Sequence, residues 1–214
     1  KNRQVKPIEP VFVDFKNDLK KDKLKNGTEI LYVANTENKT FTLNYYFDFG
    51  YRADKTIDLA ADMIDYLGTS KHSAEQLQQE FYKLACNYSI SVGNENISVS
   101  ISGLSENMDK AMALVEEIIN DIQPNEEVLK LMTGRILKSR ENAKHNQQRV
   151  CSALANYGIY GEATPTKDIL SEEQLKAYTC NQLCTAIHNL FNYRHRILYY
   201  GPENIETPKS TVEK

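Results

Sequence analysis

The stretch FTLNYYFDF constrains the fold more than any other part of this sequence, because large apolar residues occupy every second position. These positions are Phe41, Leu43, Tyr45, Phe47 and Phe49. Successive side chains of a β-strand point to opposite faces, so this period of two predicts a strand with one buried face. A later stretch, ISVSISG, alternates apolar residues with serines and predicts a second strand of the same kind.

Much of the remaining sequence has the three- and four-residue apolar spacing of amphipathic helices. Two Ser-x-x-Gln capping boxes, at Ser73 and Ser171, predict where two of these helices begin. The expected helices cover about residues 57–67, 74–85, 108–122, 126–145, 149–157 and 171–191.

Further strands are expected at Pro10–Phe15, on both sides of the hairpin signal Asn26-Gly27, at residues 88–92 and in the final stretch RHRILYYG. The lysines before Asn26 suit an exposed edge strand. The predicted element order is βββ-αα-ββ-αααα-β. Because strands and helices are segregated along the chain, we predict an α+β fold, in which an antiparallel-rich mixed sheet has helices packed on one face.

The length of 214 residues fits one α+β domain over residues 1–214, with about the first ten and last twelve residues as flanking segments. The chain begins with Lys1 instead of Met, so we expect a piece of a longer chain or a mature form. The formal net charge of −3 lacks the basic excess of nucleic-acid binders. No apolar run approaches the roughly 20 residues of a membrane span, so we expect a soluble protein, cytoplasmic or periplasmic.

Few residues suggest a chemical function by their spacing. Cys180, Cys184 and His188 are four residues apart and would share one helix face, and thiols and imidazoles are common zinc ligands. A stripe of small packed side chains is the plainer interpretation, since tetrahedral sites usually draw ligands from several elements. The sequence has no His-x-x-x-His pair, no Gly-x-Ser-x-Gly and no phosphate-binding glycine motif. Spacing alone therefore identifies no catalytic residue.

The serine face of Ile97–Gly103 is a weak candidate for substrate binding. Ser98, Ser100 and Ser102 would line this face. If the strand lies at a sheet edge, its backbone could pair with an extended peptide. The alternative is an interior strand with small outward side chains, and periodicity alone favours that alternative.

The order of elements from Leu59 to Ile122 resembles a domain of the insulinase/pitrilysin-type zinc metallopeptidases. The shared features are a helix before Gly68-Thr69, a second helix that opens with SAEQL, a strand pair, and a helix that opens near Glu-Asn. The hairpin and long strand in LKNGTEILYVANTENKTFTLNYYFDFGYRADK also match, so the resemblance covers about residues 10–201. It implies the α+β fold of mitochondrial-processing-peptidase-like domains.

In catalytic domains of that family, the helix before Gly-Thr carries His-x-x-Glu-His, whose histidines bind zinc and whose glutamate activates water. Counting back from Gly68 places Leu59, Asp62 and Met63 at these positions. Neither histidine is present, so we expect no zinc and no catalytic residue in this chain. The family's third ligand, a Glu on a later helix, would fall near Glu141. His72 lies in the turn after the motif, outside the ligand positions.

The resemblance implies a non-catalytic domain from the C-terminal half of a zinc metalloendopeptidase. Such a domain would form part of a peptide-degradation chamber and pack against a zinc-bearing homologous domain, in the same chain or in a partner subunit. Zinc would belong to that partner, and this chain alone would hydrolyse nothing. Non-catalytic halves often supply an Arg and a Tyr to the substrate, and the sequence alone does not assign such a pair to positions in this chain or elsewhere in a longer parent chain. The alternative is an inactive structural core or scaffold subunit of the same fold.

Overall fold

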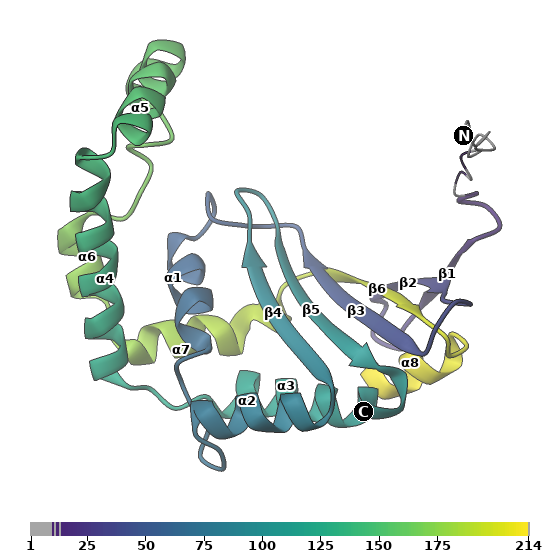
Figure 1. Ribbon diagram of the computed structural model, residues 1–214. Coiled ribbons are helices and arrows are strands. Elements are labelled where there is room, and N and C mark those ends of the chain that lie inside the picture. The colour runs from purple at the N-terminus through teal and green to yellow at the C-terminus, as the bar shows by residue number, and fades with distance from the viewer. Residues whose placement is uncertain (1–9, 11, 13, 214) are drawn as a thin grey trace, which may run out of the picture.

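In the computed structural model of the chain, which describes residues 10, 12 and 14–213, six strands form one mixed sheet (Figure 1). The strand order is β1-β2-β6-β3-β5-β4, and every neighbouring pair is antiparallel except β2 with β6. The strands are β1 (Leu19–Lys23), β2 (Glu29–Ala34), β3 (Thr40–Phe47), β4 (Cys86–Val92), β5 (Ile97–Leu104) and β6 (His195–Gly201). The predicted antiparallel-rich mixed sheet is confirmed.

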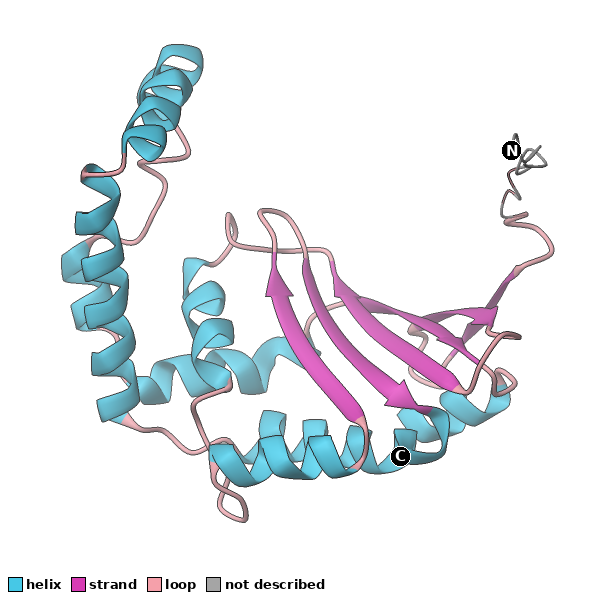
Figure 2. Cartoon of the chain, in the orientation of Figure 1, coloured by secondary structure: helices cyan, strands magenta, loops and turns pink. Residues whose placement is uncertain are grey.

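Helices cover one face of this sheet and leave the other face without a helical layer (Figure 2). The α-helices are α1 (Lys55–Ile64), α2 (Ala74–Lys83), α3 (Met108–Asp121), α4 (Glu126–Lys144), α5 (Gln147–Tyr160), α6 (Glu172–Ala177), α7 (Cys180–Asn189) and α8 (Glu206–Val212). Most buried helical side chains come from α1, α3 and α7. The expected one-sided α+β arrangement is therefore confirmed. Within the described ranges, no helix is both long and apolar enough to cross a membrane.

The period-two stretches place the core of the domain. In β3, Phe41, Leu43 and Phe47 are at most 1% exposed, and the matching apolar residues of β5 are equally buried. Leu43 lies opposite Ile101 on one side and Tyr199 on the other, so apolar rows cross the sheet from strand to strand. The intervening side chains must face the opposite side of the sheet, which carries no helices. The alternation of apolar and polar residues in β3 and β5 thus places the core on one face of the sheet.

The N-terminal hairpin forms where the sequence predicts it. Asn26-Gly27 lies in the turn between β1 and β2, and Gly27 has a φ of 87°, a conformation that suits glycine. β1 is an edge strand, as expected from its lysines. Of the strand expected at Pro10–Phe15, the described residues belong to no strand, and Val11 and Val13 lie outside the described residues. That part of the prediction is wrong for the residues that can be assessed.

The C-terminal third contains more helices than the sequence predicts. The single helix expected at 171–191 is two, because Tyr178 has an extended backbone (ψ 145°) and ends α6. Thr179 and Gln182 then form a further capping box that begins α7. The segment after residue 202, expected as a flank, contains α8, whose Pro208 and Thr211 are buried. The apolar periodicity alone predicts one helix, but the Thr179 cap begins a second helix within it.

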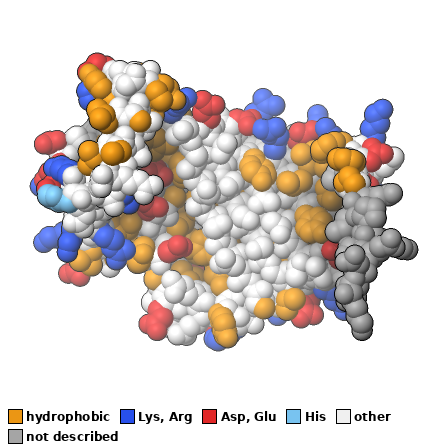
Figure 3. Space-filling model, turned by 45° about the horizontal axis from the view of Figure 1, so that its top comes forward, with side chains coloured by type: hydrophobic (Ala, Val, Ile, Leu, Met, Phe, Trp, Pro, Cys, Tyr) orange, Lys and Arg blue, Asp and Glu red, His pale blue; other side chains and the backbone are white. Residues whose placement is uncertain are grey.

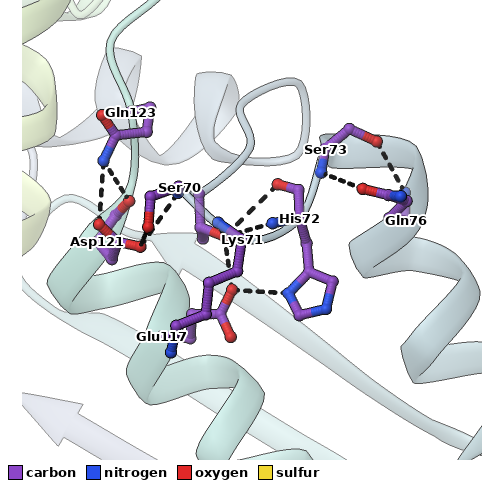
Figure 4. A network of polar contacts seen from close by, with 9 residues as sticks. Ser70, Lys71, His72, Ser73, Gln76, Glu117, Asp121 and Gln123 are labelled. Carbon is purple, nitrogen blue, oxygen red and sulfur yellow. Dashed lines mark hydrogen bonds and ion pairs between the residues drawn. The ribbon is translucent and has the colours of Figure 1, made fainter.

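The corner between α1 and α2 is held by two acidic residues of α3 (Figure 4). Glu117 accepts a hydrogen bond from the Thr69 hydroxyl at 2.5 Å, and its Oε1 lies 2.8 Å from His72 Nδ1. Asp121 accepts from both the backbone N–H and the hydroxyl of Ser70. His72 is therefore a partner of Glu117 in a well-connected turn.

The pKa of Glu117 reflects this network. Its side chain is only 12% exposed. Removal from water raises the pKa, but hydrogen bonds from Thr69 and His72 outweigh that effect and lower it below the ordinary 4.5. A carboxyl group with a lowered pKa stabilises the fold fully above its unfolded pKa. That stabilisation is lost as the pH falls through the pKa of the carboxyl group in the folded state.

We predict that Glu117→Gln lowers the free energy of unfolding at pH 7 by about 1–2 kcal/mol, because Thr69 and His72 lose a charged acceptor. The deficit relative to the unmodified chain should shrink as the pH falls below about 4.5, where Glu117 is protonated in the unfolded state, and be smallest below the lowered pKa of the folded state. Urea denaturation at several pH values measures both effects. Glu75→Gln, on the exposed side of α2, is the control and should change little. A deficit that is constant with pH would contradict the ionised network.

Candidate functional site

The three positions of α1 that the resemblance assigns to the zinc motif differ in burial. Leu59 and Met63 are 3% and 1% exposed and belong to the hydrophobic core. Met63 Sδ lies 3.9 Å from Cys180 Sγ of α7, which packs directly on α1. Asp62 is exposed and lies beside Leu59, at the edge of the buried face. A histidine at either core position would need a buried polar partner, so apolar residues here stabilise the α1–α7 contact instead.

The three candidate metal ligands of α7 are packing residues. Cys180 and Cys184 are buried, and Cys180 Sγ accepts a hydrogen bond from the Asn125 backbone N–H at 3.0 Å. Burial raises the pKa of Cys184 to about 12, so its thiol keeps its proton at neutral pH. His188 is half-buried. In the described part of the chain, no three His, Cys, Asp or Glu side chains are grouped so that they could hold a metal ion.

Glu141, the position nearest the family's third zinc ligand, is exposed on α4. It pairs with Lys144 at 2.6 Å and lies 3.8 Å from His145, both on the same helix. Its neighbour Arg140 turns the other way and donates a hydrogen bond to the Leu170 carbonyl at 2.7 Å. Arg140, and not Glu141, therefore reaches the surface that α1 presents.

A cleft of about 470 Å³ opens beside α1, at the place where the degenerate motif lies. Its walls come from α1, α4, the β4–β5 turn and the loop between α5 and α6. The apolar part of the lining is Leu59, Val92, Ile136, Ala163, Pro165, Ile169, Leu170 and Leu175. Asp58 and Asp62 of α1 also line it, together with Tyr51, Arg52 and Arg140. The cleft thus combines aliphatic walls with a small number of charged groups.

The cations around this cleft already have partners. Lys55 forms an ion pair with Asp168, whose backbone carbonyl accepts a hydrogen bond from the Tyr51 hydroxyl. Arg52 pairs with Glu95 at 2.8 Å on the surface. The bonds of Lys55 and Tyr51 to Asp168, together with the Arg140 contact, fix the α5–α6 loop against α4 and the start of α1. The α5–α6 loop is therefore held in place as one wall of the cleft by these side-chain contacts.

The two carboxylates of α1 differ from these cations, because neither has a hydrogen bond or ion pair to another described residue. Removal from water raises the pKa of Asp58, and the adjacent Asp62 raises it further. The pKa of Asp62 is raised by desolvation and by Asp65. No cation of the described residues offsets either effect. Asp58 and Asp62 therefore line the cleft without a direct ion pair, although Arg52 and Arg140 line it too.

The serine candidates lie on the open face of the sheet. Ser98, Ser100 and Ser102 are half-buried, but β5 pairs with β3 on one side and β4 on the other. Its backbone is therefore satisfied on both sides, and the edge strand next to it is β4. Register places these serines beside polar side chains of both neighbours: Thr42, Asn44, Tyr46, Asn87, Ser89 and Ser91. Figure 3, which turns the upper side of Figure 1 forward, shows a broad surface there with few charged groups.

Helix α5 contributes no buried side chain to the domain. It follows α4 and projects from the far end of that helix, away from the sheet (Figure 1). Val150, Leu154 and Tyr157 follow one another at i, i+4 and i+7, and they are 46%, 70% and 46% exposed. Ile159 is 71% exposed on the same helix. Tyr157 contacts Glu162 through its hydroxyl and Lys167 through its ring, but the apolar side chains of this stripe stay largely exposed.

Known proteins share this architecture, although no family model matches the chain. The beta subunit of mitochondrial-processing peptidase from Neurospora crassa is 22% identical over 180 residues, which cover 82% of this chain and 38% of that protein. The inactive domain of an M16 peptidase from Pseudomonas fluorescens matches with a TM-score of 0.75. It is 18% identical and covers 91% of this chain and 49% of that one. The fold is that of an M16 peptidase domain.

A further structure with the M16 fold is the periplasmic protease PqqL from Escherichia coli. It matches with a TM-score of 0.77 at 16% identity over 92% of this chain and 22% of that chain. The resemblance to the insulinase-type peptidases expected from the sequence is confirmed by these matches. This chain spans less than half the length of each of the three proteins.

Sequence reasoning missed most of the cleft. Arg140 and the loop of residues 163–170 are far from α1 in the chain, and only the tertiary fold brings them to it. The four-residue spacing of Asp58 and Asp62 was a usable signal, because it places two carboxylates on one side of a helix. The burial of Leu59 and Met63 was likewise readable from the apolar face of the same helix.

We predict that Arg140→Met loosens the α5–α6 loop, because the Leu170 carbonyl loses its charged donor. The free energy of unfolding should fall by about 1 kcal/mol. Trypsin should also cleave after Lys167 several times faster, as followed by mass spectrometry. Arg135→Met removes a guanidinium from the same helix, where it hydrogen-bonds Tyr66 and not the loop. Equal cleavage rates in the two variants would show that Arg140 does not hold the loop.

Proposed function

We propose that this chain is a non-catalytic domain of a zinc metalloendopeptidase with the M16 fold. It forms part of the peptide-degradation chamber and packs against a zinc-bearing homologous domain, in the same chain or in a partner subunit. Residues 1–214 then act as one domain of a longer assembly. The observation that carries this proposal is α5, a 14-residue helix with no buried residue.

An exposed helix of this length needs a partner surface. Isolated helices of about 12–15 residues are marginal in water, and helices in proteins depend mainly on packing an apolar face. The stripe of Val150, Leu154 and Tyr157 supplies such a face, and this domain leaves it open. The proteins that share the fold are at least twice as long as the matched segment, which leaves length for a second domain. A homologous domain over α5 would supply the missing packing.

The chemistry of the chain supports a role without catalysis. In the proposed assembly, zinc and its activated water belong to the partner, because Leu59 and Met63 are core residues at the positions where ligands would stand. The side chains of this chain would confine a peptide. The polar face of the sheet forms one wall, and the cleft beside α1 accepts side chains. A largely uncharged wall of serine, threonine and asparagine would hold diverse peptides only weakly.

A second candidate function is an inactive structural core or scaffold subunit of the same fold. The core positions of Leu59 and Met63 favour it equally, because both functions lack zinc chemistry in this chain. The two functions differ in whether the assembled partner hydrolyses peptides.

We predict that the chain alone hydrolyses no peptide, with or without added zinc, because no described group of side chains could hold the metal. Combining it with the segment of its parent protein or partner that contains His-x-x-Glu-His should produce peptide cleavage that a chelator abolishes. A quenched fluorescent peptide library measures the rate. Chelator-sensitive cleavage by the purified chain alone would refute the proposal. A combined assembly that folds but never cleaves would favour the scaffold function.

We also predict that Leu154→Glu weakens association with the zinc-bearing half by about tenfold or more, because it places a charge in an apolar interface. The stability of the chain by itself should hardly change, since Leu154 is 70% exposed. Calorimetric titration of the separate halves measures the affinity, and urea denaturation checks stability. Gln78→Glu adds the same charge on the exposed side of α2 and should leave the affinity unchanged. Equal affinities for both variants would contradict a contact through α5.

A further inference from the structure

Another cavity, of about 430 Å³, opens on the face of the sheet that the helices cover. It lies between α3, α8, the turn of the first hairpin and the turn before β6. Met112, Val115 and Ile119 of α3 and Phe191 of the turn before β6 give it apolar walls. Its volume falls within the roughly 300–1,000 Å³ of small-molecule pockets. The cavity is therefore large enough for a small organic ligand.

Tyr45 of β3 also lines this cavity and has a hydroxyl group without a partner. The side chain is 7% exposed, and its ring packs edge-on against Phe191, with 5.0 Å between the ring centroids. Side chains stand roughly perpendicular to a sheet, so the hydroxyl points from β3 toward the layer of α3. It forms no hydrogen bond to any described residue. A buried hydroxyl without a partner is unfavourable, so a ligand that bonds to it would be stabilised.

Two further acceptors line the cavity near this hydroxyl. Glu116 of α3 forms no ion pair with a described residue. Burial raises the pKa of the Tyr45 hydroxyl and the charge of Glu116 raises it further, so the phenol keeps its proton at neutral pH. His195 Nδ1 lies 2.9 Å from the Tyr193 carbonyl oxygen, which can only accept, so Nδ1 carries the hydrogen. Nε2 of the neutral ring is then an acceptor.

This set of groups favours a ligand with one positive charge and several N–H donors. Glu116 is the only Asp, Glu, Lys or Arg among the described residues that line the cavity, so an anion would be repelled. A metal ion does not fit, because no three His, Cys, Asp or Glu side chains are grouped for it in the described ranges. A primary ammonium has three donors. An aromatic ring attached to it would pack against Phe191 and the apolar side chains of α3.

We propose that this cavity binds a small primary amine that carries one aromatic ring. The ammonium group bonds to Glu116 and to the Tyr45 hydroxyl, and the ring lies between α3 and Phe191. This site goes beyond the proposed function, because it lies on the covered face of the sheet and not on the polar face assigned to the peptide chamber.

The test titrates the full 214-residue chain with phenethylamine and with phenethyl alcohol, its neutral analogue. Heteronuclear NMR measures both affinities and locates the site by the backbone signals that shift. We expect phenethylamine to bind about tenfold tighter, with shifts around Tyr45, Met112 and His195. Glu116→Gln should abolish this preference, whereas Glu127→Gln, on the exposed side of α4, should keep it. The exposed positions of both glutamates leave the fold intact.

Tyr45→Phe removes the hydroxyl, keeps the ring and should weaken phenethylamine binding about fivefold. The matched control is Tyr199→Phe, which removes another buried hydroxyl outside the cavity and should leave the affinity unchanged. Circular dichroism checks the fold of both variants.

Four outcomes would overturn the proposal. They are no saturable shift up to about 10 mM phenethylamine, equal affinity for the two probes, shifts confined to another part of the chain, and an equal effect of the two tyrosine variants. The cleavage assay of the assembled halves tests the proposed function separately. A chain that binds no amine can still pass that assay.

Discussion

One-sided burial of the sheet is the constraint on which the rest of this structure depends. The apolar rows of β3, β5 and β6 need a cover, and α1, α3 and α7 supply it on one side only. The opposite face is therefore left to Ser98, Ser100, Ser102 and their polar neighbours. A sheet with one apolar, buried face and one polar, solvent-exposed face can serve as a wall, because the packed core keeps it rigid.

The same constraint explains how α1 relates to the M16 fold. A helix that packs on α7 through Leu59 and Met63 gains the burial free energy of two large side chains, about 1.5–3 kcal/mol each. Zinc ligands at those positions would need polar surroundings that Cys180, Cys184 and Leu183 do not provide. Leu59 and Met63 therefore serve the core packing of α1 against α7. The polar residues Asp58 and Asp62 of α1 line the cleft.

Helix α5 differs from the other long helices because its apolar side chains are left largely exposed. It has no buried residue, and Leu154 on it is 70% exposed. Exposed apolar surface of this kind is typical of protein–protein contacts, and for that reason the proposed packing on a homologous domain is assigned to α5.

The sequence alone determined the elements whose signals are local. Alternation placed β3 and β5, the Asn26-Gly27 turn placed the first hairpin, and Ser73 with Gln76 began α2. The resemblance to the insulinase-type peptidases assigned Leu59 and Met63 to the positions of the zinc-binding histidines, and that assignment stays a prediction. Only the tertiary structure decided that β5 is interior, that Tyr178 divides two helices, and that Arg140 rather than Glu141 meets α1. Strand order and the cleft depend on contacts between residues far apart in the chain, and a local pattern carries no record of which distant segments meet.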